Sequence, residues 1–309
     1  MNGFDVSVGI SPRQSFDNWA AFVAGLEAEG VRRVWVIDSQ LAMKDVYAGL
    51  VVAALNTTRI GLGTGVTNAV TRHPTVTVNT IAAVAEISHG RAILGLGAGD
   101  SALYGIGLKP QKIAEMEEAI GFFRANLEKS IPIHLAVSQQ RMCELAGRLA
   151  DGAIVMGPAQ PDLVRRQVEW IEAGMRSAGR NRKDVEIAFM ATVADEPENV
   201  RSWASTQARL LTHYKELPDS LAAFRDEINR SADSYVYAEH LSTHASHGAA
   251  VSDDLVRTLA IVGTPEECAA QLRTIQATGI DSLIFPLAGR GRLERWRKMR
   301  HEILGQIMV

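Results

Sequence analysis

The residues best suited to chemistry in this sequence lie in one stretch, GTGVTNAVTRHP, at positions 63–74. The stretch ends an apolar run, so it lies where a strand gives way to a loop. Its two glycines let the main chain approach a ligand closely, and Thr67 and Asn68 supply short side chains that donate and accept hydrogen bonds. A structural corner, in which Arg72 caps the neighbouring loop, fits the same residues. The pattern therefore predicts a polar ligand site, with a purely structural turn as the alternative.

The elements that would position this stretch alternate along the chain. Apolar or β-branched runs predict eight strands, at residues 5–11, 34–38, 59–63, 92–96, 131–137, 152–156, 185–193 and 281–286. Amphipathic patterns predict helices at 16–29, 45–55, 75–87, 111–126, 139–149, 162–178 and 265–277. Strands that are apolar at nearly every position suit a parallel sheet buried on both faces. The pattern predicts an α/β fold, a (β/α)8 TIM barrel, and an open doubly wound sheet is the alternative.

One connection is too long for a single helix. The residues between the seventh strand and the helix at 265–277 are rich in helix formers, and connections of this length are usually functional or mobile. We expect residues 1–309 to form one domain, with a helical insertion at about 197–252 that lies over the barrel mouth and precedes the eighth strand. The barrel mouth, where the strands end, is where barrel enzymes carry their chemistry.

Composition and charge limit the kind of partner. The 309 residues carry a net charge of −3 and no long basic block, which argues against nucleic acid and leaves a small-molecule ligand. The N-terminal residues do not resemble a signal peptide and no segment is as apolar as a membrane span, so we expect a cytoplasmic protein without membrane contact. Cys143 and Cys268 fall in helical patterns and are expected to be buried, inert thiols. We expect a homodimer or a larger homo-oligomer.

Three longer segments resemble one protein family. They are GTGVTNAVTRHPTVTVNTIAAVAEISHGRAILGLGAGD at 63–100, ELAGRLADGAIVMGP at 144–158 and GTPEECAAQLRTIQATGIDSLIF at 263–285. Together they resemble the luciferase-like oxidoreductases that bind flavin or the deazaflavin coenzyme F420, particularly the branch around methylenetetrahydromethanopterin reductase. Ala69 stands where the family usually has proline, and the TRHP that follows is retained. The resemblance implies a TIM barrel and an oxidoreductase with a small organic substrate.

The resemblance also assigns roles to single residues. It implies that the Gly65-Val66 peptide, often cis in the family, forms a bulge that presses against the coenzyme ring. Thr67 and Asn68 would then meet the polar edge of that ring. Asp38 and Asp100 match positions near the reactive ring, where each would orient the substrate or assist proton transfer. A cap of the following loop is the alternative role of Asp38.

Further coenzyme contacts are expected at other strand ends. Gly99 and Ser101 belong to a turn that resembles the GAGD turn of the family. Gly157 and Ala159 match a segment whose amides hold the coenzyme phosphate in relatives, although Pro158 between them has no N–H group. Ser138, after the fifth strand, and Gly289 with Arg290, after the eighth, are additional candidates for binding an anion.

Other enzyme classes fit the strand ends less well. A metal-dependent hydrolase would need histidines after the first strand, where there are none; His240, His244 and His247 predict a solvated lid helix, so no metal is expected. An aldolase would need a lysine at a strand end, and a glycosidase using Asp100 and Asp195 would need more aromatic residues. The run GLGAGD lacks the third glycine of a dinucleotide fingerprint, and we expect no helix directly after it.

The coenzyme and the reaction direction stay open at this point. The TGVTN and TRHP segments favour coenzyme F420, which implies hydride transfer, whereas FMN would make an oxygen-activating monooxygenase. A non-catalytic flavin-binding protein is the alternative from another class. It would keep the ring-binding turns but lack a substrate cavity.

Overall fold

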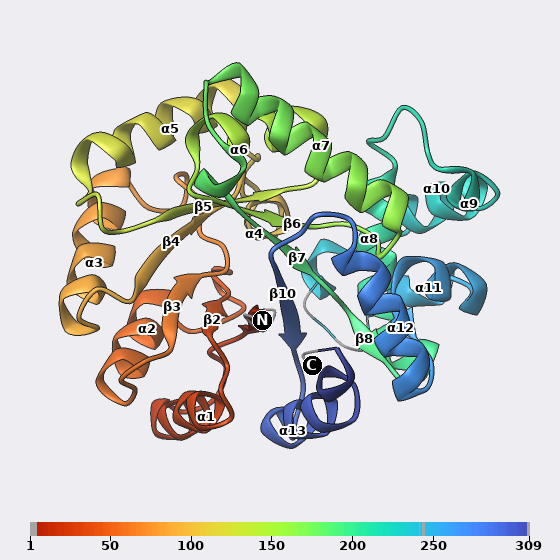
Figure 1. Cartoon of the computed structure of the whole chain (residues 1–309), viewed down its shortest axis with the longest axis horizontal. Coiled ribbons are helices and arrows are strands. Elements are labelled where there is room, and N and C mark those ends of the chain that lie inside the picture. Colours follow the sequence, from red (N-terminus) through yellow and green to blue (C-terminus); the bar gives the residue numbers. More distant parts are fainter. Residues whose placement is uncertain (1–4, 241, 243–244, 308–309) are drawn as a thin grey trace.

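Parallel strands form a closed barrel at the centre of the molecule (Figure 1). The computed structural model describes residues 5–240, 242 and 245–307. Within these residues the barrel strands follow the order β1-β10-β7-β6-β5-β4-β3-β2. Their bounds are β1 (Asp5–Ile10), β2 (Arg33–Val36), β3 (Gly61–Thr64), β4 (Ala92–Leu96), β5 (Ile133–Val137), β6 (Gly152–Val155), β7 (Glu186–Met190) and β10 (Ser282–Leu287). The predicted (β/α)8 barrel is confirmed, and the open sheet is excluded.

Helices surround the barrel, as the alternation of patterns predicts. The predicted ones are α1 (Phe16–Ala28), α2 (Val46–Leu55), α3 (Pro74–Ile87), α5 (Ile113–Asn126), α6 (Gln140–Leu149), α7 (Pro161–Ser177) and α12 (Pro265–Gln276). Side chains cap several of them, because the first amides of a helix have no partner within it. Asp45 caps α2, His73 caps α3, and Thr264 with Glu267 forms a capping box at α12. No helix in the described ranges is long and apolar enough to cross a membrane.

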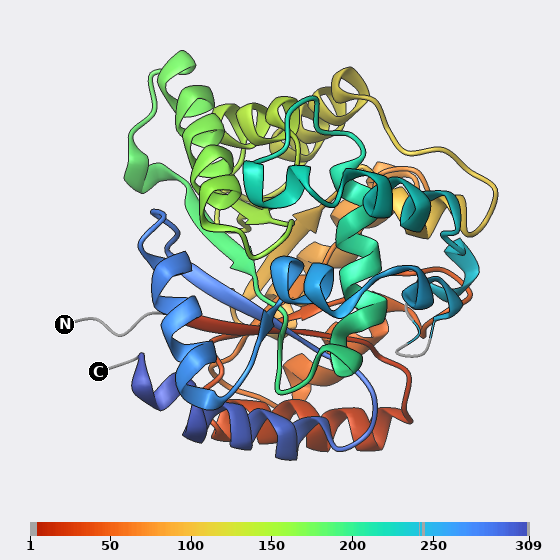
Figure 2. The ribbon, with the colours of Figure 1, turned by 90° about the vertical axis from the view of Figure 1, so that its right-hand side faces the viewer.

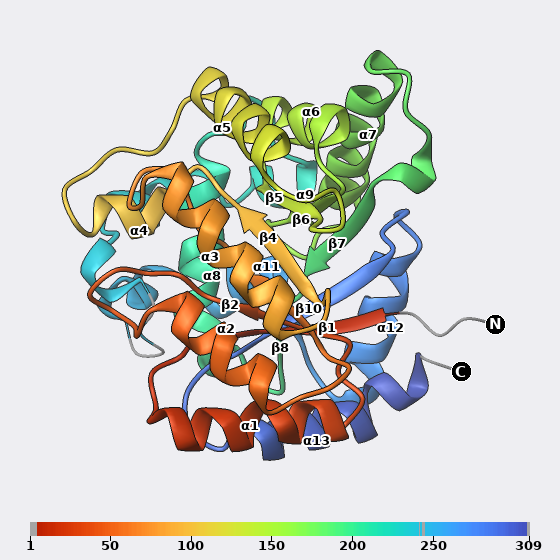
Figure 3. The ribbon, with the colours of Figure 1, turned by 90° about the vertical axis from the view of Figure 1, so that its left-hand side faces the viewer.

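One helix of the ring escapes prediction from sequence. Helix α13 (Arg292–Glu302) follows β10, and its sequence RLERWRKMRHE buries only Trp296. A mostly charged segment shows no apolar periodicity, so the sequence pattern does not predict this helix. Helix α13 lies beside α1 (Figure 3), where Glu29 accepts hydrogen bonds from Arg297 and Arg300. The last helix of the ring is thereby fixed to the first.

The segment that follows β7 leaves the barrel. Residues 185–193 were expected as one strand, but β7 ends at Met190, and β8 (Val193–Ala194) pairs outside the barrel with β9 (Ile261–Val262). The expected helical insertion lies between β8 and β9. It comprises η2 (Pro197–Val200), α8 (Arg201–Leu211), α9 (Asp219–Ala222), α10 (Arg225–Asp233), η3 (Tyr237–Glu239), η4 (Ser246–Ala250) and α11 (Asp253–Leu259). Alanines and leucines of α8 and leucines of α11 (teal and light blue in Figure 2) pack into an apolar cluster that is separate from the barrel core.

The barrel interior is apolar in its middle and polar at its base. Trp35, Ile93, Ile154, Ala188 and Ile284 form the middle layer. Polar side chains at the strand starts close the base, where Glu186 accepts hydrogen bonds from Arg33 and Ser282. The His134 ring lies 5.3 Å from the Trp35 ring, measured between centroids. Burial lowers the pKa of His134 from 6.5 to about 4, so this imidazole is neutral at pH 7.

We predict that His134 makes the fold sensitive to mild acid. The unfolded chain takes up the His134 proton near pH 6.5 but the folded protein only near pH 4, so stability falls as the pH falls between these values. Wild type should lose about 2 kcal/mol more unfolding free energy between pH 7 and pH 5 than His134→Leu. Urea denaturation at both pH values measures this. The exposed His301→Leu control should behave like wild type, and an equal loss in all three proteins would contradict the assignment.

Candidate functional site

A pocket with a volume of about 770 Å³ opens at the barrel mouth. Its walls come from the loops after four strands and from the insertion. The lining residues include Ser11, Gln14, Gln40, Ser101, Tyr237, His240, Gly289 and Arg292. Ser101 and Gly289 are predicted from the sequence as ligand-binding residues, whereas Gln40, Tyr237 and Arg292 are not. The Gly-Arg-Gly-Arg run at 289–292 is the one signal that points toward Arg292.

An apolar patch caps the interior layer at the same end of the barrel. Val66, Met156 and Met190 are partly buried and pack against the interior layer, and they stand at or just beyond the C-terminal ends of β3, β6 and β7. A Cβ atom at Gly97 would lie 2.7 Å from Val66 Cγ2, so glycine at this position leaves room for the valine. These three side chains form an apolar floor at the strand ends, and none of them is among the residues that line the largely polar pocket.

The two glycines of the 63–74 stretch leave room for Trp35. A Cβ atom at Gly63 would lie 2.6 Å from the Trp35 ring, and one at Gly65 would lie 2.8 Å from the Trp35 carbonyl carbon. The backbone of β2 is thus one reason for glycine at position 65, and the expected approach of a ligand to Gly65 stays a prediction. The Gly65-Val66 peptide is cis, as the resemblance implies. Contact between this peptide and a coenzyme stays a prediction.

We predict that Gly65→Ala destabilises the fold itself. The added methyl group meets rigid backbone, so the unfolding free energy should fall by about 2 kcal/mol or more. Gly121→Ala is the matched control, because a Cβ atom at that position of α5 has no neighbour within 4 Å. That variant should be neutral or slightly stabilised. Thermal unfolding of both variants measures the difference, and an unchanged melting temperature for Gly65→Ala would refute the packing role.

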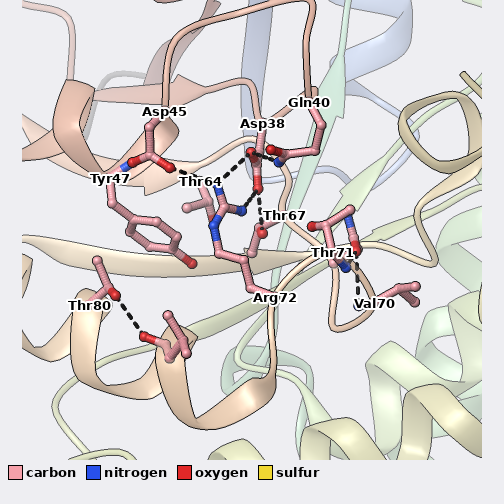
Figure 4. Close-up of polar contacts among 12 residues, drawn as sticks. Asp38, Gln40, Asp45, Tyr47, Thr64, Thr67, Val70, Thr71, Arg72 and Thr80 are labelled. Carbon is pink, nitrogen blue, oxygen red and sulfur yellow. Dashed lines mark hydrogen bonds and ion pairs between the residues drawn. The ribbon is translucent and has the colours of Figure 1, made fainter. Parts of the chain in front are cut away.

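Asp38 is the centre of a buried polar network (Figure 4). Its side chain is 2% exposed, and Oδ2 accepts hydrogen bonds from Thr67 Oγ1 at 2.7 Å and from Arg72 Nη1 at 2.5 Å. Its Oδ1 accepts from Gln40 Nε2 at 2.8 Å and from Arg72 Nη2 at 3.2 Å. Arg72 Nη2 also donates to Asp45, the cap of α2, at 2.8 Å. Both carboxylate oxygens of Asp38 are thus engaged by protein groups.

This network favours the structural alternative for Arg72. Burial opposes the charge of Arg72, but its hydrogen bonds and ion pairs with Asp38 and Asp45 prevail and raise its pKa above the ordinary value. The guanidinium therefore stays charged and bridges the loop after β2 to the loop after β3. Asn68 adds a second constraint, because its Oδ1 accepts hydrogen bonds from the amides of Val70 and Thr71. Proton transfer by Asp38 stays a prediction.

We predict that removing the Arg72 charge destabilises the protein through Asp38. Arg72→Gln leaves a buried carboxylate without its cation, and such losses cost about 3–5 kcal/mol. Adding Asp38→Asn to Arg72→Gln should recover part of this loss, because the uncompensated charge is then gone. The control is Arg165→Gln, which breaks an exposed pair with Asp162 and should cost less than about 1 kcal/mol. Equal unfolding free energies for Arg72→Gln and Arg165→Gln, measured in urea, would contradict the network.

Asp100 joins the barrel to the insertion. A short helix, α4 (Asp100–Tyr104), begins directly after GLGAG, so the expectation of no helix there is wrong. Gly99 precedes it with φ 102°, a conformation that favours glycine. The Asp100 carboxylate, 45% exposed, pairs with Arg209 of α8 at 2.5 Å, and Arg209 lies over the Tyr237 ring. The mouth is thereby tied to the insertion, and proton transfer by Asp100 stays a prediction.

The remaining predicted coenzyme contacts lie under the insertion. The Ser138 carbonyl accepts hydrogen bonds from Gln167 and from the Tyr214 hydroxyl. The Ala159 amide donates to the Leu259 carbonyl at 2.9 Å, so this amide already has a partner. Gly157 is buried and lies outside the residues that line the pocket. The structure does not bring these residues to the pocket, and their coenzyme-binding role stays a prediction.

Two of the histidines predicted on a solvated lid helix lie among the described residues, and both are at least partly buried. His240 lines the pocket and its Nδ1 hydrogen-bonds to the Tyr235 hydroxyl, while the buried His247 stacks on Tyr235 at 4.2 Å between ring centroids. Burial lowers the pKa of His240 to about 4. His244 lies outside the described residues. No group of three potential metal ligands occurs among the described residues.

Comparison with known proteins relates this geometry to one family. The profile of the luciferase-like monooxygenases matches residues 3–282. A 5,10-methylenetetrahydromethanopterin reductase from Methanolobus tindarius is 30% identical over 284 residues, which cover 84% of this chain and 86% of that protein. An F420-dependent glucose-6-phosphate dehydrogenase from Microbacterium testaceum is 25% identical over 58% of this chain and 68% of its own length.

Solved structures show the same fold. The coenzyme F420-dependent tetrahydromethanopterin reductase from Methanopyrus kandleri superposes with a TM-score of 0.79 at 19% identity, covering 99% of this chain and all of its own. An F420-dependent secondary alcohol dehydrogenase, solved with an F420-acetone adduct, reaches 0.78 at 16% identity, covering 99% of each chain. An FMN-bound Baeyer-Villiger monooxygenase from Pseudomonas putida reaches 0.66 at 15% identity, covering 99% of this chain and 98% of its own.

Proposed function

This chain belongs to the luciferase-like monooxygenase family, and from that premise we propose that it is an oxidoreductase that transfers a hydride between coenzyme F420 and a small organic substrate. The observation that carries the proposal is the barrel mouth, where the apolar floor and the polar pocket lie at the ends of the strands. Relatives of the chain support F420: two are F420-dependent glucose-6-phosphate dehydrogenases, and the superposed tetrahydromethanopterin reductase from Methanopyrus kandleri is coenzyme F420-dependent.

The residues at the mouth fit a flat tricyclic coenzyme. Such a ring needs an apolar surface against its face and paired donors and acceptors at its polar edge. Val66, Met156 and Met190 offer the apolar surface. Gln40 and His240 offer polar groups on the pocket wall. FMN has the same kind of ring, so an FMN-dependent monooxygenase is the alternative that the experiment below separates.

The coenzyme and the protein residues contribute different things to the proposed reaction. When bound, the coenzyme supplies the hydride chemistry, and the protein supplies position, orientation and exclusion of water. Asp38 is best suited to a positioning role, because it fixes Thr67 and Arg72 beside the floor. The His240 imidazole is neutral at pH 7, so it orients a ligand by hydrogen bonding rather than by charge. We assign to the insertion the closing of the mouth, since it carries Tyr237 and His240 into the pocket.

We predict that the purified protein binds coenzyme F420 more tightly than FMN by about tenfold or more, because several of its relatives are F420-dependent enzymes. Titration followed by absorbance and fluorescence measures both dissociation constants. Val66→Ala should weaken F420 binding about 5-fold, since a contact surface of the floor is lost. The control is Val76→Ala on the outer face of α3, where Val76 is 50% exposed. Tighter FMN binding would favour the monooxygenase alternative, and binding of neither coenzyme would refute the proposal.

Two further expectations concern the molecule as a whole. A homo-oligomeric assembly and a cytoplasmic location both stay predictions. A non-catalytic flavin-binding role is disfavoured by the pocket of about 770 Å³ beside the floor, because a purely ring-binding protein needs no substrate cavity.

A further inference from the structure

One wall of the pocket is built from arginines. Arg13 follows β1, and Arg292 opens α13 after β10; both line the pocket. Arg295 lies one turn further along α13 and donates to the carbonyls of Ala288 and Arg290, which holds the loop after β10. Because β1 and β10 are neighbours in the barrel, the segments that carry these three arginines, here called the arginine wall, follow neighbouring strands.

The arginine wall lacks compensating negative charge. In the described ranges, none of its three guanidinium groups lies within 4 Å of a carboxylate, whereas Arg297 and Arg300 on the same helix both pair with Glu29. Burial lowers the pKa of Arg292, and the charges of Arg295 and Arg13 lower it further. A partly buried guanidinium normally has an anionic partner. Arg292 is partly buried, whereas Arg13 and Arg295 are exposed, so it is the charge of Arg292 that is left for a ligand.

Arg292 is held ready for such a ligand. Its Nη1 donates to the Ser11 carbonyl at 3.1 Å, its Nη2 donates to Gln14 Oε1, and the guanidinium lies 4.2 Å from the Phe22 ring centroid. These contacts fix the side chain without neutralising it. A preorganised guanidinium loses little entropy when it binds a carboxylate or phosphate in a bidentate manner.

We infer that the arginine wall binds an anionic group, a carboxylate or a phosphate, of the substrate that reacts with the coenzyme. The inference rests on the proposed function, because it takes the anionic group to be part of the substrate of that reaction. The floor that fits the coenzyme ring comes from β3, β6 and β7, whereas the wall comes from β1 and β10. The wall borders the pocket and the floor lies outside its lining, so the two parts suit two different groups at the barrel mouth. The coenzyme's own phosphate has the same chemistry, so the experiment must separate the two sources.

The test is calorimetric titration of the full-length protein with inorganic phosphate at low ionic strength. Wild type should bind phosphate, and Arg292→Gln should bind it about 10- to 100-fold more weakly, which is the usual loss of a charged hydrogen bond. Arg292→Lys should keep part of the affinity. The control Arg257→Gln removes an exposed arginine of α11 and should match wild type. Thermal unfolding of each variant shows that it is folded.

A second titration, with coenzyme F420, assigns the bound anion. Under the inference, Arg292→Gln binds F420 within about twofold of wild type while phosphate binding is lost. An equal loss of F420 affinity would show that the arginine wall binds the coenzyme phosphate, and it would overturn the assignment to the substrate. Unchanged phosphate binding in Arg292→Gln would overturn the site. If wild type binds phosphate but neither coenzyme, the proposed function fails while the anion site stands.

Discussion

A carboxylate that is 2% exposed is stable only when polar groups of the protein replace the water it has lost. At the mouth of this barrel that carboxylate is Asp38, and its partners come from two loops: Gln40 after β2, and Thr67 and Arg72 after β3. Arg72 extends the network to Asp45, which starts α2. The position of Val66, one residue before Thr67, follows from the same network. The position of Val66 in the floor therefore depends on an ion pair that takes no direct part in the chemistry we propose.

The sequence predicts the barrel well, because strands buried on both faces are apolar throughout and the helices between them are amphipathic. It misses α13, whose charged sequence carries no periodicity. It identifies the 63–74 stretch as special but does not reveal that Trp35 leaves no room for a side chain at Gly65, because no sequence pattern shows which neighbour an absent side chain would meet. Arg209 and Tyr237 lie more than a hundred residues from the turn at Asp100 that they contact or border, so only the fold reveals them.

The mouth is divided into parts with different tasks. An apolar floor suits the face of a coenzyme ring, a cationic wall suits an anionic group, and the insertion adds Tyr237 and His240 on the remaining side. The pair between Asp100 and Arg209 fixes the insertion to the barrel, so the parts keep their relative positions. Luciferase-like relatives of this fold act with different coenzymes, and the coenzyme brings the reactive atoms in each case. This protein contributes the shape and the charge of the pocket beside the reactive atoms of the coenzyme.

The central claim is that the floor and the pocket form one coenzyme site. A crystal structure of the protein with bound F420 tests it most directly. The account predicts electron density for the ring in contact with Val66, Met156 and Met190, with Asp38 still paired to Arg72 and with Arg292 facing open space beside the ring. A ring bound elsewhere, or one placed over the floor only after the Asp38 and Arg72 pair has separated, would contradict the account.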